Sequence, residues 1–165
     1  MKESQNKVIF LAYGAVIAAL YVVLTLPFAS FAFGPIQFRF AEALTILPYF
    51  TPAAIPGVTI GCFLANLLGG APLMDVVFGS LATLIGALLS YALRRKKWLV
   101  CIPPILSNTI IVPWVLRFAY GVPDAVPYLM LTVGIGECIA VGILGNLLLY
   151  ALQPLKQALF EKCHA

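Results

Sequence analysis

The stretch VIFLAYGAVIAALYVVLTLPF, residues 8–28, decides the fold class of this chain. It carries no charged residue over 21 positions. About 20 consecutive apolar residues are what an α-helix needs to cross the hydrocarbon core of a bilayer. No small-residue cleavage site follows the stretch, so we expect it to be a first transmembrane helix and not a removed signal peptide.

The composition of the whole chain agrees with this reading. Of 165 residues, 62% are hydrophobic and 10% are charged, and the mean hydropathy is +1.04. Soluble domains average about 25% charged residues, and a small soluble domain could not bury this much apolar surface. We therefore expect one membrane-embedded domain over residues 1–165, surrounded by lipid and without a soluble domain such as an ATPase.

Further apolar runs follow the first one along the chain. The prolines Pro52 and Pro56 separate the second run from the third, because proline cannot continue a helix. The pattern predicts an all-α bundle of six transmembrane helices. The second and third runs are short, and a re-entrant hairpin is the alternative for them. The five later runs cover residues 41–50, 56–68, 73–93, 98–118 and 127–152.

The basic residues indicate how this bundle lies in the membrane. Positively charged residues favour cytoplasmic loops. A cytoplasmic N-terminus, four spans, a cytoplasmic central loop and two more spans place both termini in the cytoplasm. Membrane topology thus accounts for these charges, and we do not expect nucleic acid as a partner. Eight of the ten basic residues follow the pattern: Lys2, Lys7, Arg94, Arg95, Lys96, Lys97, Lys156 and Lys162.

The remaining polar residues map to the opposite side of the bundle. Glu137 lies ~15 Å into the last run at 1.5 Å per residue. An ionisable side chain at that depth is costly unless it is paired or faces a wet cavity. The arrangement predicts an outward-open pocket for a small polar solute, lined by some of Arg39, Glu42, Asn66, Asp75, Arg117, Asp124 and Glu137.

Several of these residues also have a structural explanation. Arg39 and Glu42 are three positions apart and could form an ion pair at a helix start. Asp75 could be an anion that the helix dipole favours in a first turn, and Asp124 is expected to be solvated. Asn146 should point away from Glu137 and bond another helix.

Other residue patterns limit the chemistry. The chain has no nucleotide loop, Ser/His pair, metal-ligand spacing or disulfide framework, so we expect no enzyme, no metal and no cofactor. Energy for transport would come from a gradient or from another protein's ATPase. Small residues on the first run, which let helix backbones approach, mark either internal packing or a docking face for a partner helix: Ala12, Ala15 and Ala19.

Three segments carry a resemblance to a known family. QFRFAEAL at residues 37–44, IPGVTIGCFLANL at 55–67 and DVVFGSLATL at 75–84 resemble the QueT family, and the similarity covers nearly the whole chain. That family consists of substrate-binding (S) components of energy-coupling factor transporters. The resemblance implies a bacterial plasma-membrane subunit that captures 7-deazaguanine queuosine precursors, such as queuine or the 7-aminomethyl base.

The resemblance also implies partners. A transmembrane scaffold subunit and two cytoplasmic ATPases, which use the ATP, would complete the importer. In related S-components a small-residue motif on the first helix meets the scaffold, and Ala12, Ala15 and Ala19 match it.

The chemistry of a 7-deazaguanine suggests roles for individual residues. A carboxylate would accept the N1–H and 2-amino donors, for which Glu137 is our choice and Glu42 the alternative. Asp75 would bind a cationic 7-substituent. The base O6 would take a donor, and the ring an aromatic plane, from Asn66, Asn108, Gln37 or Arg39 and from Trp114 or Phe38. The aromatic segment 29–40 would serve as a lid.

Alternative functions remain open from the sequence. An S-component for a different vitamin or nucleobase, or a stand-alone secondary carrier, would use the same architecture. A membrane enzyme with Glu137 and Asp75 as acid and base lacks a nucleophile or metal cluster. A structural membrane protein would leave the one-sided polar set unexplained.

Overall fold

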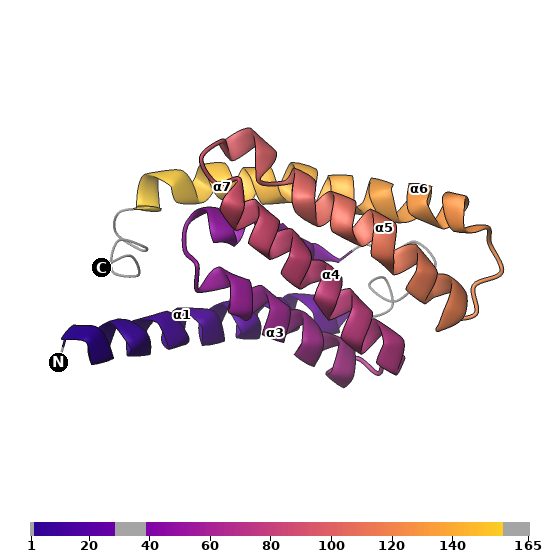
Figure 1. Cartoon of the computed structure of the whole chain (residues 1–165), viewed down its shortest axis with the longest axis horizontal. Coiled ribbons are helices and arrows are strands. Elements are labelled where there is room, and N and C mark those ends of the chain that lie inside the picture. Colours follow the sequence, from indigo (N-terminus) through magenta and orange to yellow (C-terminus); the bar gives the residue numbers. More distant parts are fainter. Residues whose placement is uncertain (1, 29–38, 157–165) are drawn as a thin grey trace.

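The computed structural model describes residues 2–28 and 39–156, which are helical and contain no strand. Figure 1 shows the main helices running along one direction. The α-helices are α1 (Lys2–Thr25), α3 (Ala54–Leu68), α4 (Leu73–Ala92), α5 (Ile102–Phe118), α6 (Val126–Glu137) and α7 (Asn146–Leu152). Three short 3-10 turns and two longer non-α segments complete them: Leu26–Phe28, Lys97–Leu99, Gln153–Leu155, the 3-10 helix η2 (Phe40–Tyr49) and the π-helix η4 (Cys138–Gly145).

Four helical segments are long and apolar enough to cross a membrane: Ser4–Phe28, Leu73–Ala92, Lys97–Phe118 and Val126–Leu155. They coincide with the first, fourth, fifth and sixth predicted runs. The last of them is one continuous path through α6, η4 and α7. The third run forms α3, a shorter apolar helix of 15 residues, about 22 Å long at 1.5 Å per residue.

The second predicted run differs most from expectation. Residues 40–49 form a 3-10 helix of 10 residues with Pro48 inside it, where we expected a short transmembrane helix or, as the alternative, one arm of a re-entrant hairpin. Proline disfavours the α-helix because its ring clashes with the carbonyl four residues back. At about 2.0 Å per residue this element is about 20 Å long, less than the ~30 Å hydrocarbon core.

Glycines set the closest helix contacts. A Cβ added at Gly61 of α3 would lie 2.6 Å from Cβ of Tyr21 on α1, and one at Gly57 would lie 2.9 Å from Cβ of Ile17. On α4, a Cβ at Gly86 would lie 2.8 Å from Cα of Pro104 on α5. These glycines therefore serve packing between helices of this chain, which is one of the two roles, beside docking of a partner helix, that small residues on a helix face can have.

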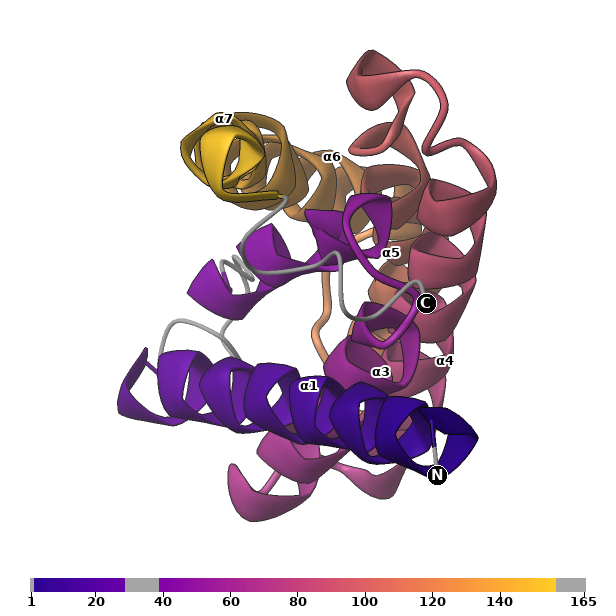
Figure 2. The same ribbon diagram turned by 90° about the vertical axis from the view of Figure 1, so that its left-hand side faces the viewer.

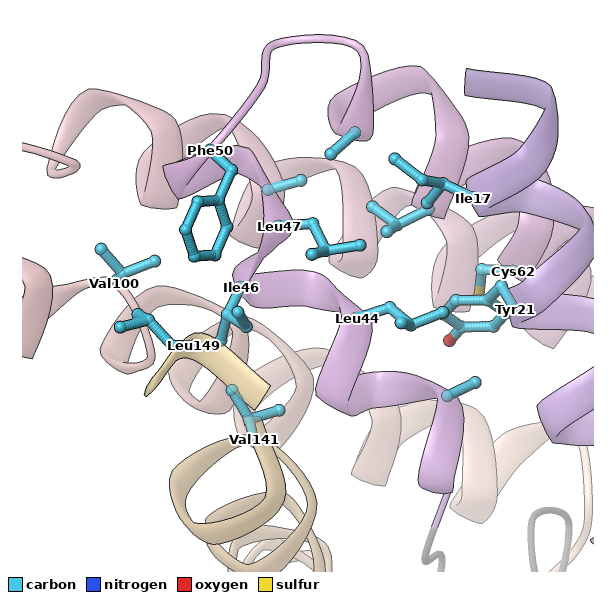
Figure 3. Close-up of a cluster of buried hydrophobic side chains, with 14 of the residues drawn as sticks. Ile17, Tyr21, Leu44, Ile46, Leu47, Phe50, Cys62, Val100, Val141 and Leu149 are labelled. Atoms are coloured by element: carbon cyan, nitrogen blue, oxygen red, sulfur yellow. The ribbon is translucent and has the colours of Figure 1, made fainter. Parts of the chain in front are cut away.

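The element η2 occupies the middle of the bundle. Figure 2 shows it between α1 on one side and α6 and α7 on the other, and it packs against both. Figure 3 shows its side chains Leu44, Ile46 and Leu47, with Phe50 just after it, within the main apolar cluster. This placement brings a polar residue of η2, Glu42, into the interior.

The basic segments share one end of the bundle. The N-terminal end of α1, the connection between α4 and α5, and the end of α7 all lie on the left of Figure 1. Side-chain contacts agree: Nζ of Lys97 lies 5.1 Å from the Tyr150 ring centroid, and Nζ of Lys156 lies 5.2 Å from that of Tyr49. The starts of α4 and α6 lie at the opposite end.

Candidate functional site

Five parts of the fold bring together six of the predicted polar residues. Arg39 and Glu42 come from the start of η2, Asn66 from the last turns of α3, Asp75 from the first turn of α4, Asn108 from the middle of α5 and Glu137 from the end of α6. Each is less than 10% exposed. Buried polar groups of this kind need partners, and they fall into two connected groups.

The first group is organised around Asp75. Nη2 of Arg39 forms an ion pair with Oδ2 of Asp75 at 3.1 Å, and Nη1 donates to Oδ1 of Asn66, also at 3.1 Å. Nδ2 of Asn66 donates to the backbone oxygen of Asp75 at 3.0 Å, and the Tyr120 hydroxyl donates to Oδ2 of Asp75 at 2.7 Å. The guanidinium therefore pairs across the bundle with α4, and the ion pair between Arg39 and Glu42 that their spacing allowed does not form.

Tyr120 lies in the connection between α5 and α6, outside the candidate spans. Burial and the neighbouring Asp75 carboxylate raise the pKa of its phenol. The hydroxyl thus stays protonated at neutral pH and remains a donor to Asp75. This hydrogen bond fastens the α5–α6 connection to the start of α4.

The second group contains two buried carboxylates. Oε1 of Glu42 accepts a hydrogen bond from the Tyr21 hydroxyl at 2.5 Å, and Oε1 of Glu137 accepts one from Nδ2 of Asn108 at 3.0 Å. Among the described residues, Oε2 of each carboxylate has no hydrogen-bond partner. An unsatisfied buried acceptor costs about 1–3 kcal/mol, and more if it is charged. These two oxygens are therefore positions where a ligand or water would be stabilised.

Both carboxylates line one small cavity. It is enclosed by Arg39, Glu42, Gly79, Asn108, Val112 and Glu137. Its interior volume is about 10 Å³, which is roughly the space that one water needs. A bicyclic base would therefore enter only if the walls of the cavity move apart.

Gly79 lies between the two groups. It lines the cavity, and a Cβ added to it would lie 2.5 Å from Oδ1 of Asp75 and 3.1 Å from Nδ2 of Asn66. Glycine at this position lets the ion-pair cluster sit directly against the cavity wall.

A π-helix begins immediately after Glu137. Turns of this kind are rare and often occur at functional sites. Nδ2 of Asn146, at its end, donates to the backbone oxygen of Gly142 at 2.6 Å. Asn146 thus bonds a carbonyl four residues back in its own helical segment, and not another helix as predicted.

Other predicted residues lie apart from the cavity. Trp114 is 48% exposed, with its ring stacked near that of Phe118 at 6.1 Å, so it does not lie with the buried cluster. Arg117 and Asp124 are exposed, which confirms the prediction of a solvated Asp124. Gln37, Phe38 and most of the predicted lid lie outside the described residues.

The small residues of the first helix lie on its outer surface. Ala12, Ala15 and Ala19 are exposed. Ala15 and Ala19 line an apolar groove of about 560 Å³ between α1 and α3, together with Gly57. Of the described residues, no cluster of histidine, cysteine and acidic side chains could hold a metal ion.

Sequence reasoning missed two tyrosines of the site. Tyr21 is fully buried and Tyr120 is partly buried, and each donates to a carboxylate. Tyrosine is common near membrane surfaces, so neither residue stood out. No pattern in the sequence sets Tyr21 apart from Tyr13 on the same helix.

Comparisons with known proteins agree with this picture. The family model for the QueT transporter matches residues 11–154. A queuosine precursor transporter QueT from Lactococcus lactis subsp. cremoris (strain MG1363) is 42% identical over 73 residues, which are 43% of this chain and 43% of the relative. The match thus spans less than half of that relative's length. No solved structure matches the chain.

Proposed function

The chain belongs to the QueT transporter family, whose members are transporters and not enzymes, and from this premise we propose that it captures 7-deazaguanine precursors of queuosine for import. Its apolar helices make it a multi-pass membrane protein. The observation that carries the substrate proposal is the pair of buried carboxylates, Glu42 and Glu137, whose free oxygens adjoin one cavity. The name of the Lactococcus lactis relative supports the same class of substrate.

A guanine-like edge fits the Glu137 side of this cavity. The edge presents two adjacent N–H donors, and a carboxylate accepts both. Asn108 holds Glu137 by one oxygen and lines the cavity itself, so it is placed to read the adjacent carbonyl of the base. Arg39, which also lines the cavity, is a second donor for that carbonyl.

We further propose that the bundle presents this site to the outside. Six helical segments, with η2 and α3 as the short second and third, would place both termini and residues 94–97 in the cytoplasm. Asp75 and Tyr120, at the opposite end, would then face outward. Residues 1–165 would act as one domain in the bacterial plasma membrane.

Import would also require partners, because the sequence contains no nucleotide-binding loop of the kind that ATPases use. The exposed Ala15 and Ala19, in the apolar groove between α1 and α3, would receive a helix of the transmembrane scaffold subunit. Two cytoplasmic ATPases would use the ATP.

Binding to the purified protein tests the substrate proposal. We expect 7-deazaguanines to raise its thermal unfolding temperature, since a ligand that binds only the folded state stabilises it. Vitamins should give no shift. Glu137→Gln should weaken the affinity about tenfold or more, because a hydrogen bond to a charged group contributes about 1.5–3 kcal/mol.

Asp124→Asn is the matched control, since it removes an exposed carboxylate that does not line the cavity. Its affinity should equal that of the unmodified protein. A Glu137→Gln protein that binds the bases as tightly as Asp124→Asn would refute the role of Glu137.

A further inference from the structure

The charges around the cavity do not balance. Three buried carboxylates, those of Glu42, Asp75 and Glu137, surround one buried guanidinium, that of Arg39. Arg39 forms its ion pair with Asp75. The partners that the other two carboxylates have among the described residues, Tyr21 and Asn108, are neutral donors.

A neutral ligand would leave this imbalance in place. The donor edge of a base can satisfy the free oxygen of one carboxylate. The second carboxylate would then have to take up a proton or remain buried without a compensating charge, and both cost free energy. A ligand that carries a cationic group in addition to the donor edge would satisfy both.

From the sequence we expected Asp75 to bind such a cationic group, but its contacts in the structure argue against this role. Oδ2 of Asp75 already receives both the Arg39 guanidinium and the Tyr120 hydroxyl. Its other oxygen, Oδ1, has no hydrogen-bond partner among the described residues, but it lies against Gly79, where an added Cβ would come within 2.5 Å of it. Asp75 is also absent from the residues that line the cavity.

Glu42 and Glu137 differ in how they are held. Glu137 adjoins Asn108, whose amide has both a donor and an acceptor and so suits a nucleobase edge. Glu42 accepts its hydrogen bond from the Tyr21 hydroxyl, and its Oε2, which has no hydrogen-bond partner among the described residues, lies at the cavity. We propose that Glu42 selects ligands with a positively charged 7-substituent, such as a protonated aminomethyl group, while Glu137 and Asn108 hold the base edge. This inference rests on the proposed function.

Calorimetry with three bases tests it on the purified full chain. The probes are 7-aminomethyl-7-deazaguanine, which is cationic, and its neutral 7-hydroxymethyl and 7-methyl analogues of similar size. We expect the aminomethyl base to bind at least about tenfold more tightly than the hydroxymethyl base, as expected for a hydrogen bond to a charged group. Glu42→Gln should bring this ratio close to one, and Asp124→Asn should leave it unchanged.

The outcomes separate the two proposals. If none of the three bases binds, the proposed function fails. If the bases bind but the unmodified protein shows no preference for the cationic one, the function stands and the inference fails, whether or not Glu42→Gln folds. If Glu137→Gln and not Glu42→Gln removes the preference, the assignment to Glu42 is overturned.

Discussion

At the scale of single residues, the site depends on how each carboxylate is satisfied. Asp75 has a cation, a hydroxyl donor and a nearby amide, so its burial is compensated. Glu42 and Glu137 each have one neutral donor and one free oxygen. Oδ1 of Asp75 also has no hydrogen-bond partner among the described residues, but only the two glutamates line the cavity, which makes them the candidates for a binding role.

The contact at Gly79 yields a prediction about stability. Gly79→Ala places a methyl group 2.5 Å from Oδ1 of Asp75, which forces the ion-pair cluster to shift. We expect a loss of about 1–3 kcal/mol in the free energy of unfolding, typical of overpacking. Thermal unfolding in detergent, with and without a 7-deazaguanine, measures it.

Gly134→Ala is the control for this substitution. Gly134 lies in α6, and an added Cβ there would contact Thr109 at 3.5 Å, an ordinary van der Waals distance. Its stability should be unchanged or slightly higher, because alanine favours helices more than glycine does. Equal stability of the two variants would contradict the close contact at Gly79.

At the scale of elements, the two carboxylates lie in or next to irregular helices. Glu42 lies in a 3-10 helix, and Glu137 is the last residue before a π-helix. Both geometries hold the backbone less well than an α-helix. The two elements also pack on each other, and a Cβ added at Gly145 of η4 would lie 3.1 Å from Cγ2 of Ile46 on η2. The cavity thus lies where regular α-helical geometry is interrupted on two sides.

Larger side chains should have different effects at the packed contact between α1 and α3 and on the exposed face of α1. Gly61→Ala brings a Cβ to 2.6 Å from that of Tyr21 on the inner face, whereas Ala15→Leu adds to an exposed position in the groove between α1 and α3. We expect Gly61→Ala to lower the free energy of unfolding by about 1–3 kcal/mol. Ala15→Leu should leave stability and base binding intact.

Copurification with the scaffold and ATPase subunits is the second measurement on these variants. Ala15→Leu should reduce it strongly, because small residues are needed where two helices approach closely. Retention of the complete complex by Ala15→Leu would show that the groove is not the docking face.

The elements also show where sequence reasoning succeeded. Runs of apolar residues predicted α4 and the path from α6 to α7 closely, since lipid imposes a long uninterrupted helix. The 3-10 geometry of η2 was not predicted, because it depends on packing in the middle of the bundle. Arg39 was identified, but its partner is 36 positions away and required the fold.

At the scale of the whole molecule, the two ends of the bundle differ in their polar residues, and an apolar surface separates them. Large hydrophobic side chains such as Leu73, Leu131 and Leu147 are well exposed, as lipid-facing residues should be. Basic segments lie at one end, and the cluster of Asp75 and Tyr120 lies towards the other. This polarity is what a receptor for an external solute requires.

Cysteine labelling in intact cells tests that polarity. In a chain whose own cysteines have been replaced, Asp124→Cys should react with a membrane-impermeant maleimide added outside, because it is exposed in the α5–α6 connection. Lys96→Cys, exposed in the connection between α4 and α5, should react only after the membrane is permeabilised. The proposed orientation, which follows the positive-inside rule, puts the basic end in the cytoplasm with an even number of crossings between residues 94–97 and the N-terminus. Labelling of Lys96→Cys from outside would therefore reverse the proposed orientation, and with it the access of external bases to Glu42 and Glu137.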